Sequence, residues 1–324
     1  MQIELFAFAQ GVLLLLLAPA MVGVVQYFKA RLQRRTRRLS FIGQPYRDLL
    51  KLLRKTAVRP QTASRFFGIT PALLFVTYGG LAFTIPILQP ETFIAADLIM
   101  IIYALGLARF VLSLAGLDAG APLGGVGGSR EMFLHFITEI CLFLILAALA
   151  LQWDTVNLEA LITNQANNWK LTFVQPQFLL MGLAFFIIVL FENGRIPIDN
   201  PTTHLELTMS HRAITLEFAG FDLALIEWAE MIKFAFLTTL FLDLFVPLSL
   251  VRTWSFLPGA GWHFVATTID YGLKLLFFLF ILAFWEMQRP KLRLRQVIRP
   301  GLMAIVFCLI AIVYIVATVL SESA

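Results

Sequence analysis

The segment FLHFITEICLFLILAALAL, residues 133–151, is almost wholly apolar and yet carries an acidic residue, Glu139, near its centre. An apolar run of about 20 residues has the length of a helix that crosses a bilayer. Similar runs recur along the 324-residue chain, which is 59% hydrophobic and only 14% charged, with a mean hydropathy of +0.83. A soluble domain carries about 25% charged residues, and the short alternating segments of a membrane β-barrel are absent. The sequence therefore predicts an all-α polytopic membrane protein.

Eight transmembrane helices are expected within a single membrane domain, because no low-complexity linker and no internal repeat divides residues 1–324. The expected spans lie at about residues 3–28, 70–89, 94–115, 131–151, 177–194, 223–250, 264–287 and 301–320.

The distribution of basic residues between the expected loops predicts the orientation of these spans. The loop between the first two spans (29–65) carries 12 Lys and Arg residues, and the connector at 288–300 carries five. The loops on the opposite side carry two in total. Since short basic loops remain on the cytoplasmic side, we expect a multi-pass protein of the inner (plasma) membrane with both termini outside. The net charge of +5 then reflects topology, and no nucleic-acid partner is expected.

An additional amphipathic helix is expected after Gly43–Gln44–Pro45. Its leucines at 49, 50, 52 and 53 fall largely on one helical face, opposite basic residues such as Arg47 and Lys51. Such a helix could lie in the membrane interface and bind anionic lipid. It could equally form a docking surface for an acidic soluble partner, and the two roles are compatible.

Carboxylates and cations inside apolar segments are the strongest functional signal, because an ionised group at mid-bilayer costs roughly 2.5–3.5 kcal/mol on insertion scales. The segment at 226–250 contains Glu227, Glu230 and Lys233 within about a third of the helix circumference. These groups could exchange protons, or they could serve only as polar contacts between helices.

Two further stretches of sequence combine charge with unusual backbone residues. The stretch GLDAGAPLGGVGGSREMFLHFITE (116–139) begins with the glycine-rich loop expected between the spans at 94–115 and 131–151, whose backbone allows close approach. Glu131 and Glu139 follow on one helical face with His135 between them, so that this stripe could pass a proton or His135 could simply pack. The stretch FENGRIPIDNPTTHLELTMSHRAITLEFAGFD (191–222) is polar for a connector, but its histidine spacing matches no zinc pattern.

A family resemblance spans nearly the whole chain. It is carried by RLQRR…QPYRDLLKLLRK (31–55), ARFVLSLAGLDAGAP (108–122), GGSRE (127–131) and GRIPIDNPTTHLELTMSH (194–211). These stretches resemble the membrane protein that anchors the peripheral arm in complex I-related enzymes, known as subunit 1 of NADH:quinone oxidoreductase. Within that group the chain most resembles the membrane anchor of group 4 [NiFe] hydrogenases of the formate hydrogenlyase or hydrogenase-4 type. The resemblance implies eight helices and an outward N-terminus.

One departure from the family pattern separates two branches of it. The quinone-reducing counterpart has an acid-rich loop resembling D-x-P-E-A-E-x-E-L, whereas the present chain reads DNPTTHLEL at 199–207. Thr202 and His204 stand where acids would be, which favours the hydrogenase-like branch. The remaining alternatives are a quinone-binding subunit, a transporter that works alone and a passive assembly anchor.

The resemblance also implies partners and cofactors outside this chain. Expected partners are hydrogenase-like large and small subunits, a ferredoxin-like Fe–S subunit and antiporter-like membrane subunits. Fe–S clusters would lie in those partners, together with a Ni–Fe site where the large subunit retains one. The chain itself is expected to bind no cofactor or metal, because Cys141 and Cys308 lack ligand spacing.

From charge and resemblance together we expect two groups of functional residues and no catalytic residue in the isolated chain. The candidate proton pathway comprises Glu131, Glu139, Glu192, Glu206, Glu217, Glu227, Glu230 and Lys233. The candidate interface to the soluble redox arm comprises Arg47, Asp118, Arg130, Arg195, Asp199 and His204.

Overall fold

The computed structural model describes residues 2–36, 38–88, 92–168, 175–198, 210–246, 260–290, 292 and 294–323. Over these residues the chain is helical, and its one β-type pairing is an isolated bridge between Asp97 and Asn157. In chain order the helices are α1 (Gln2–Leu32), the 3-10 helix η1 (Leu39–Gly43), α2 (Gln44–Leu53), α3 (Arg65–Ala82), α4 (Leu98–Asp118), α5 (Pro122–Trp153), α6 (Leu158–Asn167), α8 (Pro176–Glu192), α9 (His211–Thr215), α10 (Gly220–Phe245), α11 (Ala260–Gln288) and α12 (Leu294–Ser323).

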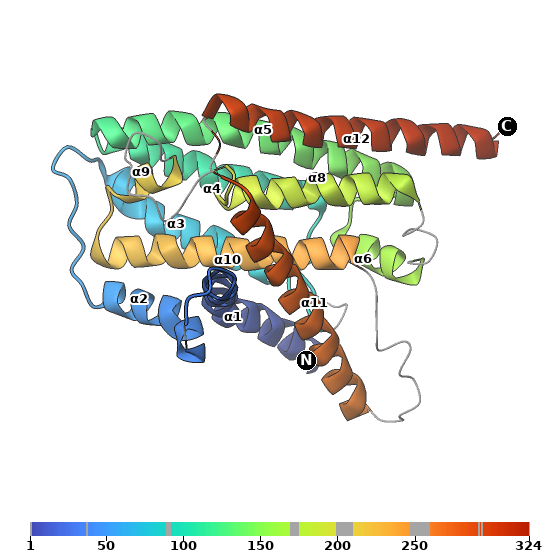
Figure 1. Ribbon diagram of the computed structural model, residues 1–324, viewed down its shortest axis with the longest axis horizontal. Coiled ribbons are helices and arrows are strands. Elements are labelled where there is room, and N and C mark those ends of the chain that lie inside the picture. Colours follow the sequence, from blue (N-terminus) through green and yellow to red (C-terminus); the bar gives the residue numbers. More distant parts are fainter. Residues whose placement is uncertain are drawn as a thin grey trace.

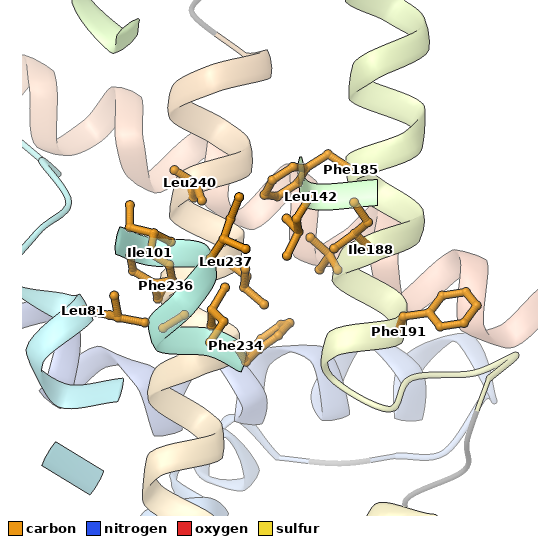
Figure 2. Packing of buried hydrophobic residues seen from close by; sticks show 14 of the residues in the cluster. Leu81, Ile101, Leu142, Phe185, Ile188, Phe191, Phe234, Phe236, Leu237 and Leu240 are labelled. Carbon is orange, nitrogen blue, oxygen red and sulfur yellow. The ribbon is translucent and has the colours of Figure 1, made fainter. Parts of the chain in front are cut away.

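The long helices form a bundle around α10. Helices α5, α8 and α12 pack against one another along the long axis of the molecule, while α11 runs obliquely to them and packs on α1 and α10 (Figure 1). Helix α10 contacts α1, α2, α3, α6, α8 and α11. Its side chains Phe234, Phe236 and Leu237 are buried, and they pack with residues such as Leu81 and Phe185 in the core (Figure 2). The helix with the most neighbours is thus also the one that carries Glu230 and Lys233.

Six helices in the described part of the chain are long and apolar enough to cross a membrane, by length and composition. They are Glu4–Leu32, Arg65–Ala82, Leu98–Asp118, Pro122–Trp153, Phe264–Gln288 and Gln296–Thr318. Helix α8 is apolar but has only 17 residues, and α10 has 26 residues but carries several charged side chains. The chain is therefore an integral membrane protein, and the expected count of eight spans remains a prediction.

The amphipathic helix expected after residue 45 is present as α2. Its apolar face packs on α1 and α10, where Pro45 and Leu49 are buried, while Arg47 and Lys51 are exposed on the other face. The sequence pattern correctly predicted the helix, but Leu50, one of the four leucines assigned to its apolar face, is 55% exposed. A location in the membrane interface remains a prediction.

The expected loop at the glycine-rich stretch is wrong over most of its length, because α5 already begins at Pro122. The glycines allow two helices to pack closely instead. A Cβ atom at Gly124 would lie 2.5 Å from the carbonyl oxygen of Gly116 on α4. Small residues at such crossings are typical of membrane helices. With 32 residues, α5 is about 48 Å long, which exceeds the ~30 Å thickness of the hydrocarbon core.

The end of α3 also differs from the expected span at 70–89, since the helix ends at Ala82. Pro86 disfavours helical conformation in the residue before it. The backbone that follows obtains a partner from another helix, because the buried Gln10 side chain accepts hydrogen bonds from the N–H groups of Ile87 and Leu88 at 3.0 and 2.7 Å.

The close contact of α4 and α5 predicts opposite effects for two adjacent glycines. Gly124→Ala should lower the free energy of unfolding by about 1–3 kcal/mol, because the added methyl group has no room against Gly116. Gly125→Ala should leave it unchanged or raise it by up to about 1 kcal/mol, because its Cβ would meet only Leu117 Cδ2, at 3.7 Å. The thermal unfolding midpoints of the detergent-solubilised variants measure the difference, and equal midpoints would contradict this account of the crossing.

Candidate functional site

Arg109 is the centre of a group of buried charged side chains. It lies in α4 and is only 2% exposed. Its Nη2 atom lies 2.9 Å from Glu192 Oε2, and its Nη1 atom lies 3.7 Å from Glu131 Oε1. Nη2 also donates a hydrogen bond to the carbonyl oxygen of Glu192 at 2.5 Å. One guanidinium therefore connects the carboxylates of α5 and α8.

His135 extends this group along α5. Its Nδ1 atom lies 3.9 Å from Glu192 Oε1, and its Nε2 atom lies 3.7 Å from Glu139 Oε2. Thr138 donates a hydrogen bond to Glu192 Oε1 at 2.8 Å. The stripe of Glu131, His135 and Glu139 predicted from their spacing is therefore present, and Glu192 of α8 packs against it.

His211 extends the group in the other direction. It begins the short helix α9, with Nδ1 3.8 Å from Glu131 Oε1 and Nε2 3.9 Å from Glu230 Oε1. Glu230 in turn lies 2.5 Å from the ammonium of Lys233, one turn further along α10. Lys233 is 1% exposed and lies over the ring of Tyr78, with Nζ 5.4 Å from the ring centroid.

These contacts form one continuous series, which we name the acid–base chain. Its members in spatial order are Lys233, Glu230, His211, Glu131, Arg109, Glu192, His135 and Glu139. Arginine does not lose its proton under ordinary conditions, so Arg109 is a fixed cation between two halves. Each half contains a histidine between two carboxylates, and imidazole can both accept and donate a proton near neutral pH.

One end of the acid–base chain opens into a cavity of about 750 Å³. We name it the polar cavity; α1, α2, α10 and residues 193–195 form its walls. The charged and titratable side chains that line it are Lys29, Arg35, Asp48, Arg195, His211, Arg212, Glu227 and Glu230. Glu227 forms an ion pair with Arg212 across this space. Both Glu230 and His211 are therefore accessible from the polar cavity.

Glu286 of α11 is held by two cations at the rim of the polar cavity. It is buried and forms ion pairs with Lys29 of α1 and with Arg195, whose Nη1 lies 3.3 Å from Glu286 Oε1. The guanidinium of Arg195 also lies over the ring of Phe234 on α10, 4.4 Å from its centroid. Burial lowers the pKa of Arg195 to about 10, so the side chain stays cationic at neutral pH. This cluster ties α1, α10 and α11 together beside the cavity.

Glu139 forms the other end of the acid–base chain. Its side chain is 35% exposed, in contrast to the almost fully covered carboxylate of Glu192. Gly106 of α4 lies beside it, and a Cβ atom there would lie 3.4 Å from His135 Nε2 and 3.6 Å from Glu139 Oε1. No side chain of α4 covers Glu139 at this position, so the chain of charges reaches the lateral surface of the bundle.

The other expected site residues lie apart from the acid–base chain or beside its cavity. Glu217 lies against Gly124, and Asp118 accepts hydrogen bonds from the Ser64 backbone N–H and hydroxyl at 3.0 and 2.8 Å. Arg47 donates to the carbonyl oxygen of Ser40, and Arg130 is half-buried at the beginning of α5. Arg195 is buried at the cavity rim and is not part of an exposed surface. Asp199, His204 and Glu206 lie outside the described residues.

Sequence reasoning misses three parts of this arrangement. It assigns Arg109 to neither group of candidate residues, whereas the structure makes it the central cation. It leaves His135 open between proton transfer and packing, and it considers His211 only for a zinc site, which the histidine spacing does not support. The signal for Arg109 is its position within the apolar run of residues 98–118, where an arginine requires buried carboxylates.

The described residues contain no group of three or more His, Cys, Asp or Glu side chains arranged to hold a metal ion. Cys141 and Cys308 are buried thiols in the packed interior.

Comparison with known proteins places this geometry in context. A family model described as "NADH dehydrogenase" matches residues 5–319. The chain is 35% identical over 246 residues to Hydrogenase-4 component C of Escherichia coli (strain K12), covering 75% of each chain. It is 27% identical over 292 residues to Formate hydrogenlyase subunit 4 of the same organism, covering 90% of this chain and 91% of that one.

A solved structure shares the fold. A chain in the structure of the membrane-bound sulfane sulfur reductase, described as an archaeal respiratory membrane complex, superposes with a TM-score of 0.77. The match covers 96% of the present chain and 100% of that chain, at 19% sequence identity.

Because Arg109 is central to these contacts, we expect its substitution to lower stability strongly and a second substitution to restore part of the loss. Arg109→Gln should lower the free energy of unfolding by about 3–5 kcal/mol, because it leaves Glu131 and Glu192 buried without their cation. Adding Glu192→Gln should restore part of that loss, since one of the two uncompensated charges is then removed. Thermal unfolding of the two variants measures both effects. A double variant less stable than Arg109→Gln alone would show that the pairing described here does not determine stability.

Proposed function

The chain belongs to the NADH dehydrogenase family, and from this premise we propose that it is the membrane subunit through which a complex I-like, hydrogenase-type complex couples electron transfer to proton or sodium translocation. In this proposal the chain crosses the inner membrane eight times with both termini outside. Its basic loops bind a soluble arm with hydrogenase-like large and small subunits and a ferredoxin-like subunit. Antiporter-like subunits adjoin it within the membrane. Fe–S clusters, and a Ni–Fe site where one is retained, belong to the partner subunits.

The observation that carries the proposal is the continuity of the acid–base chain between the polar cavity and Glu139. Titratable groups inside a membrane protein are costly, and they mark ion pathways when they face the interior of the bundle. Here each contact between successive members is 3.9 Å or less, and they come from α4, α5, α8, α9 and α10. Polar contacts that only held the helices together would not require a series in which each of two histidines lies between two carboxylates.

A proton would enter from the polar cavity at Glu227 or Glu230 and pass through His211 to Glu131. The histidine contacts of 3.7–3.9 Å exceed a direct hydrogen bond of about 2.7–3.2 Å. Transfer therefore needs a bridging water or a small movement of the imidazole at each step. Buried atoms available to such water include Glu230 Oε1 and His135 Nδ1, which have no hydrogen-bonding partner in the described part of the chain.

Arg109 would control passage between the two halves. Its guanidinium pairs with the carboxyl groups of Glu131 and Glu192 and does not itself carry a proton onward. A change of charge or position in the soluble arm would shift the balance between these two carboxyl groups. The proton would then leave through His135 and Glu139 toward a neighbouring membrane subunit, because Glu139 lies at the lateral surface of the bundle.

The hydrogenase-like branch is favoured over a quinone-binding subunit by the loop at 199–207, where Thr202 and His204 replace acids. Turnover of the purified complex with a quinone as the sole acceptor, and its inhibition by a quinone analogue, would support the quinone-binding alternative. Ion flux from this chain alone in liposomes would support a transporter that works without partners.

The proposal predicts that substitutions within the acid–base chain slow ion translocation and that substitution of a carboxylate outside it does not. Glu230→Gln and Glu139→Gln in the reconstituted complex should each slow ion translocation by about tenfold or more, because each removes a proton-accepting group from the series. Glu159→Gln on α6 should leave translocation unchanged, since Glu159 lies outside the acid–base chain. Redox turnover and ion uptake are measured in the same vesicles.

A passive anchor would behave differently in this experiment. Under that alternative, Glu230→Gln and Glu139→Gln complexes that assemble would retain wild-type turnover and pumping. Such a result would end the proton-pathway interpretation, while leaving the family assignment unaffected.

A further inference from the structure

A second large cavity lies on the opposite side of residues 195–198 from the polar cavity. It has a volume of about 760 Å³ and follows one face of α8, between α10, α11 and α12. We name it the apolar groove. Its walls include Leu179, Leu183 and Phe186 of α8, Phe241 of α10, Ile281 of α11 and Met303 of α12. The groove exists because α11 runs obliquely away from α8 and α12, which lie nearly parallel to one another (Figure 1).

Two arginines lie at one end of the apolar groove. Arg289 follows directly after α11 and Arg299 belongs to the beginning of α12; both are exposed and both line the groove. The guanidinium of Arg289 lies over the indole of Trp285, 5.0 Å from the ring centroid, and this tryptophan also lines the groove. Within the described part of the chain, no carboxylate forms an ion pair with either arginine. Their positive charge is therefore available to an external anion.

Away from its arginine end, the lining of the groove is apolar, as the acyl chains of a lipid require. Flexible acyl chains can fill a narrow, uniformly apolar space, and their head group would then lie at the arginine end.

From the combination of an apolar groove with two unpaired arginines at its mouth, we propose that this is a binding site for an anionic phospholipid. The acyl chains would lie along α8 between α11 and α12, and the phosphate would contact Arg289 and Arg299. Basic pockets between transmembrane helices are suited to anionic head groups. Trp285 is placed at the level of the head group, as is common for tryptophan at a membrane interface.

The position of the site gives the lipid a structural role next to the acid–base chain. Pro197 and Ile198 line the apolar groove, while Arg195 lines the polar cavity, so that one short segment separates the two spaces. A hydrogen bond from the Leu292 N–H to the carbonyl oxygen of Pro197, at 2.9 Å, attaches this segment to the connector between α11 and α12. A bound lipid would hold α11 and α12 around this segment and keep the ion pair of Arg195 with Glu286 in place.

The first test compares head groups on the intact membrane complex, without any substitution. The complex is purified in detergent, stripped of lipid, and titrated with phosphatidylglycerol or with phosphatidylcholine of the same acyl chains, and bound lipid is counted by native mass spectrometry. The proposal expects tighter binding of phosphatidylglycerol. Equal retention of the two lipids would overturn it, because the arginines would then contribute nothing.

The second test asks whether the preference for an anionic head group depends on Arg289 and Arg299. Arg289→Gln with Arg299→Gln should weaken phosphatidylglycerol binding by about 30-fold, on the attraction expected for two arginines near an anionic group, and leave phosphatidylcholine binding unchanged. The matched control, Arg38→Gln with Arg65→Gln, removes two exposed arginines that lie outside α2 and line neither cavity, and it should leave both unchanged. Equal losses in the two double variants would overturn the proposed location.

A third variant tests the groove itself. Leu183→Trp should fill the space and displace the lipid, whereas Leu309→Trp on an exposed face of α12 should not. If a photo-crosslinker at position 183 captures a neighbouring subunit in place of lipid, the groove is a subunit interface and the proposal fails.

Discussion

The structure depends on compensating charge inside a medium that does not solvate it. Four carboxyl groups of the acid–base chain, those of Glu131, Glu139, Glu192 and Glu230, face two fixed cations, Arg109 and Lys233. Full ionisation of all six would leave two negative charges in excess, and uncompensated charge is expensive to bury. Neutrality therefore requires about two further protons, carried by the histidines or by the carboxyl groups themselves. The side chains that balance the charge are thus the same ones that the proposed proton pathway uses.

Helix packing makes this charge balance possible. The glycines at 116 and 124 allow α4 and α5 to approach closely, and the same pair of helices carries Arg109 and Glu131. The spacing of Glu131, His135 and Glu139 along one face of α5 then turns a single close contact into a longitudinal series. A bulkier residue at the crossing would separate the helices and weaken the contact between Arg109 and Glu131. The glycines are thus part of the electrostatics as well as of the packing.

Sequence alone could predict much of this arrangement but not its connections. Hydropathy predicted the helical character, and helical periodicity predicted the stripe on α5 and the helix α2. The sequence could not predict that Arg109 contacts Glu192, because those residues come from different helices and their contact depends on how the bundle packs. The sequence also could not predict that the glycine-rich stretch is helical, because glycine disfavours a helix locally. Here the helix is stabilised by its close packing against α4. Tertiary contact outweighed local propensity at that point.

The contrast between the two cavities follows from the same charge balance. The polar cavity needs water and charge because it exposes Glu230 and His211, whereas the apolar groove begins only a few residues away on the far side of 195–198. If water crossed that segment, the ion pairs of Glu286 would be screened and the rim that links α1, α10 and α11 would loosen. An apolar occupant on one side therefore strengthens the electrostatic contacts on the other. The lipid-facing surface and the charged interior are in this sense one physical system, joined at Arg195.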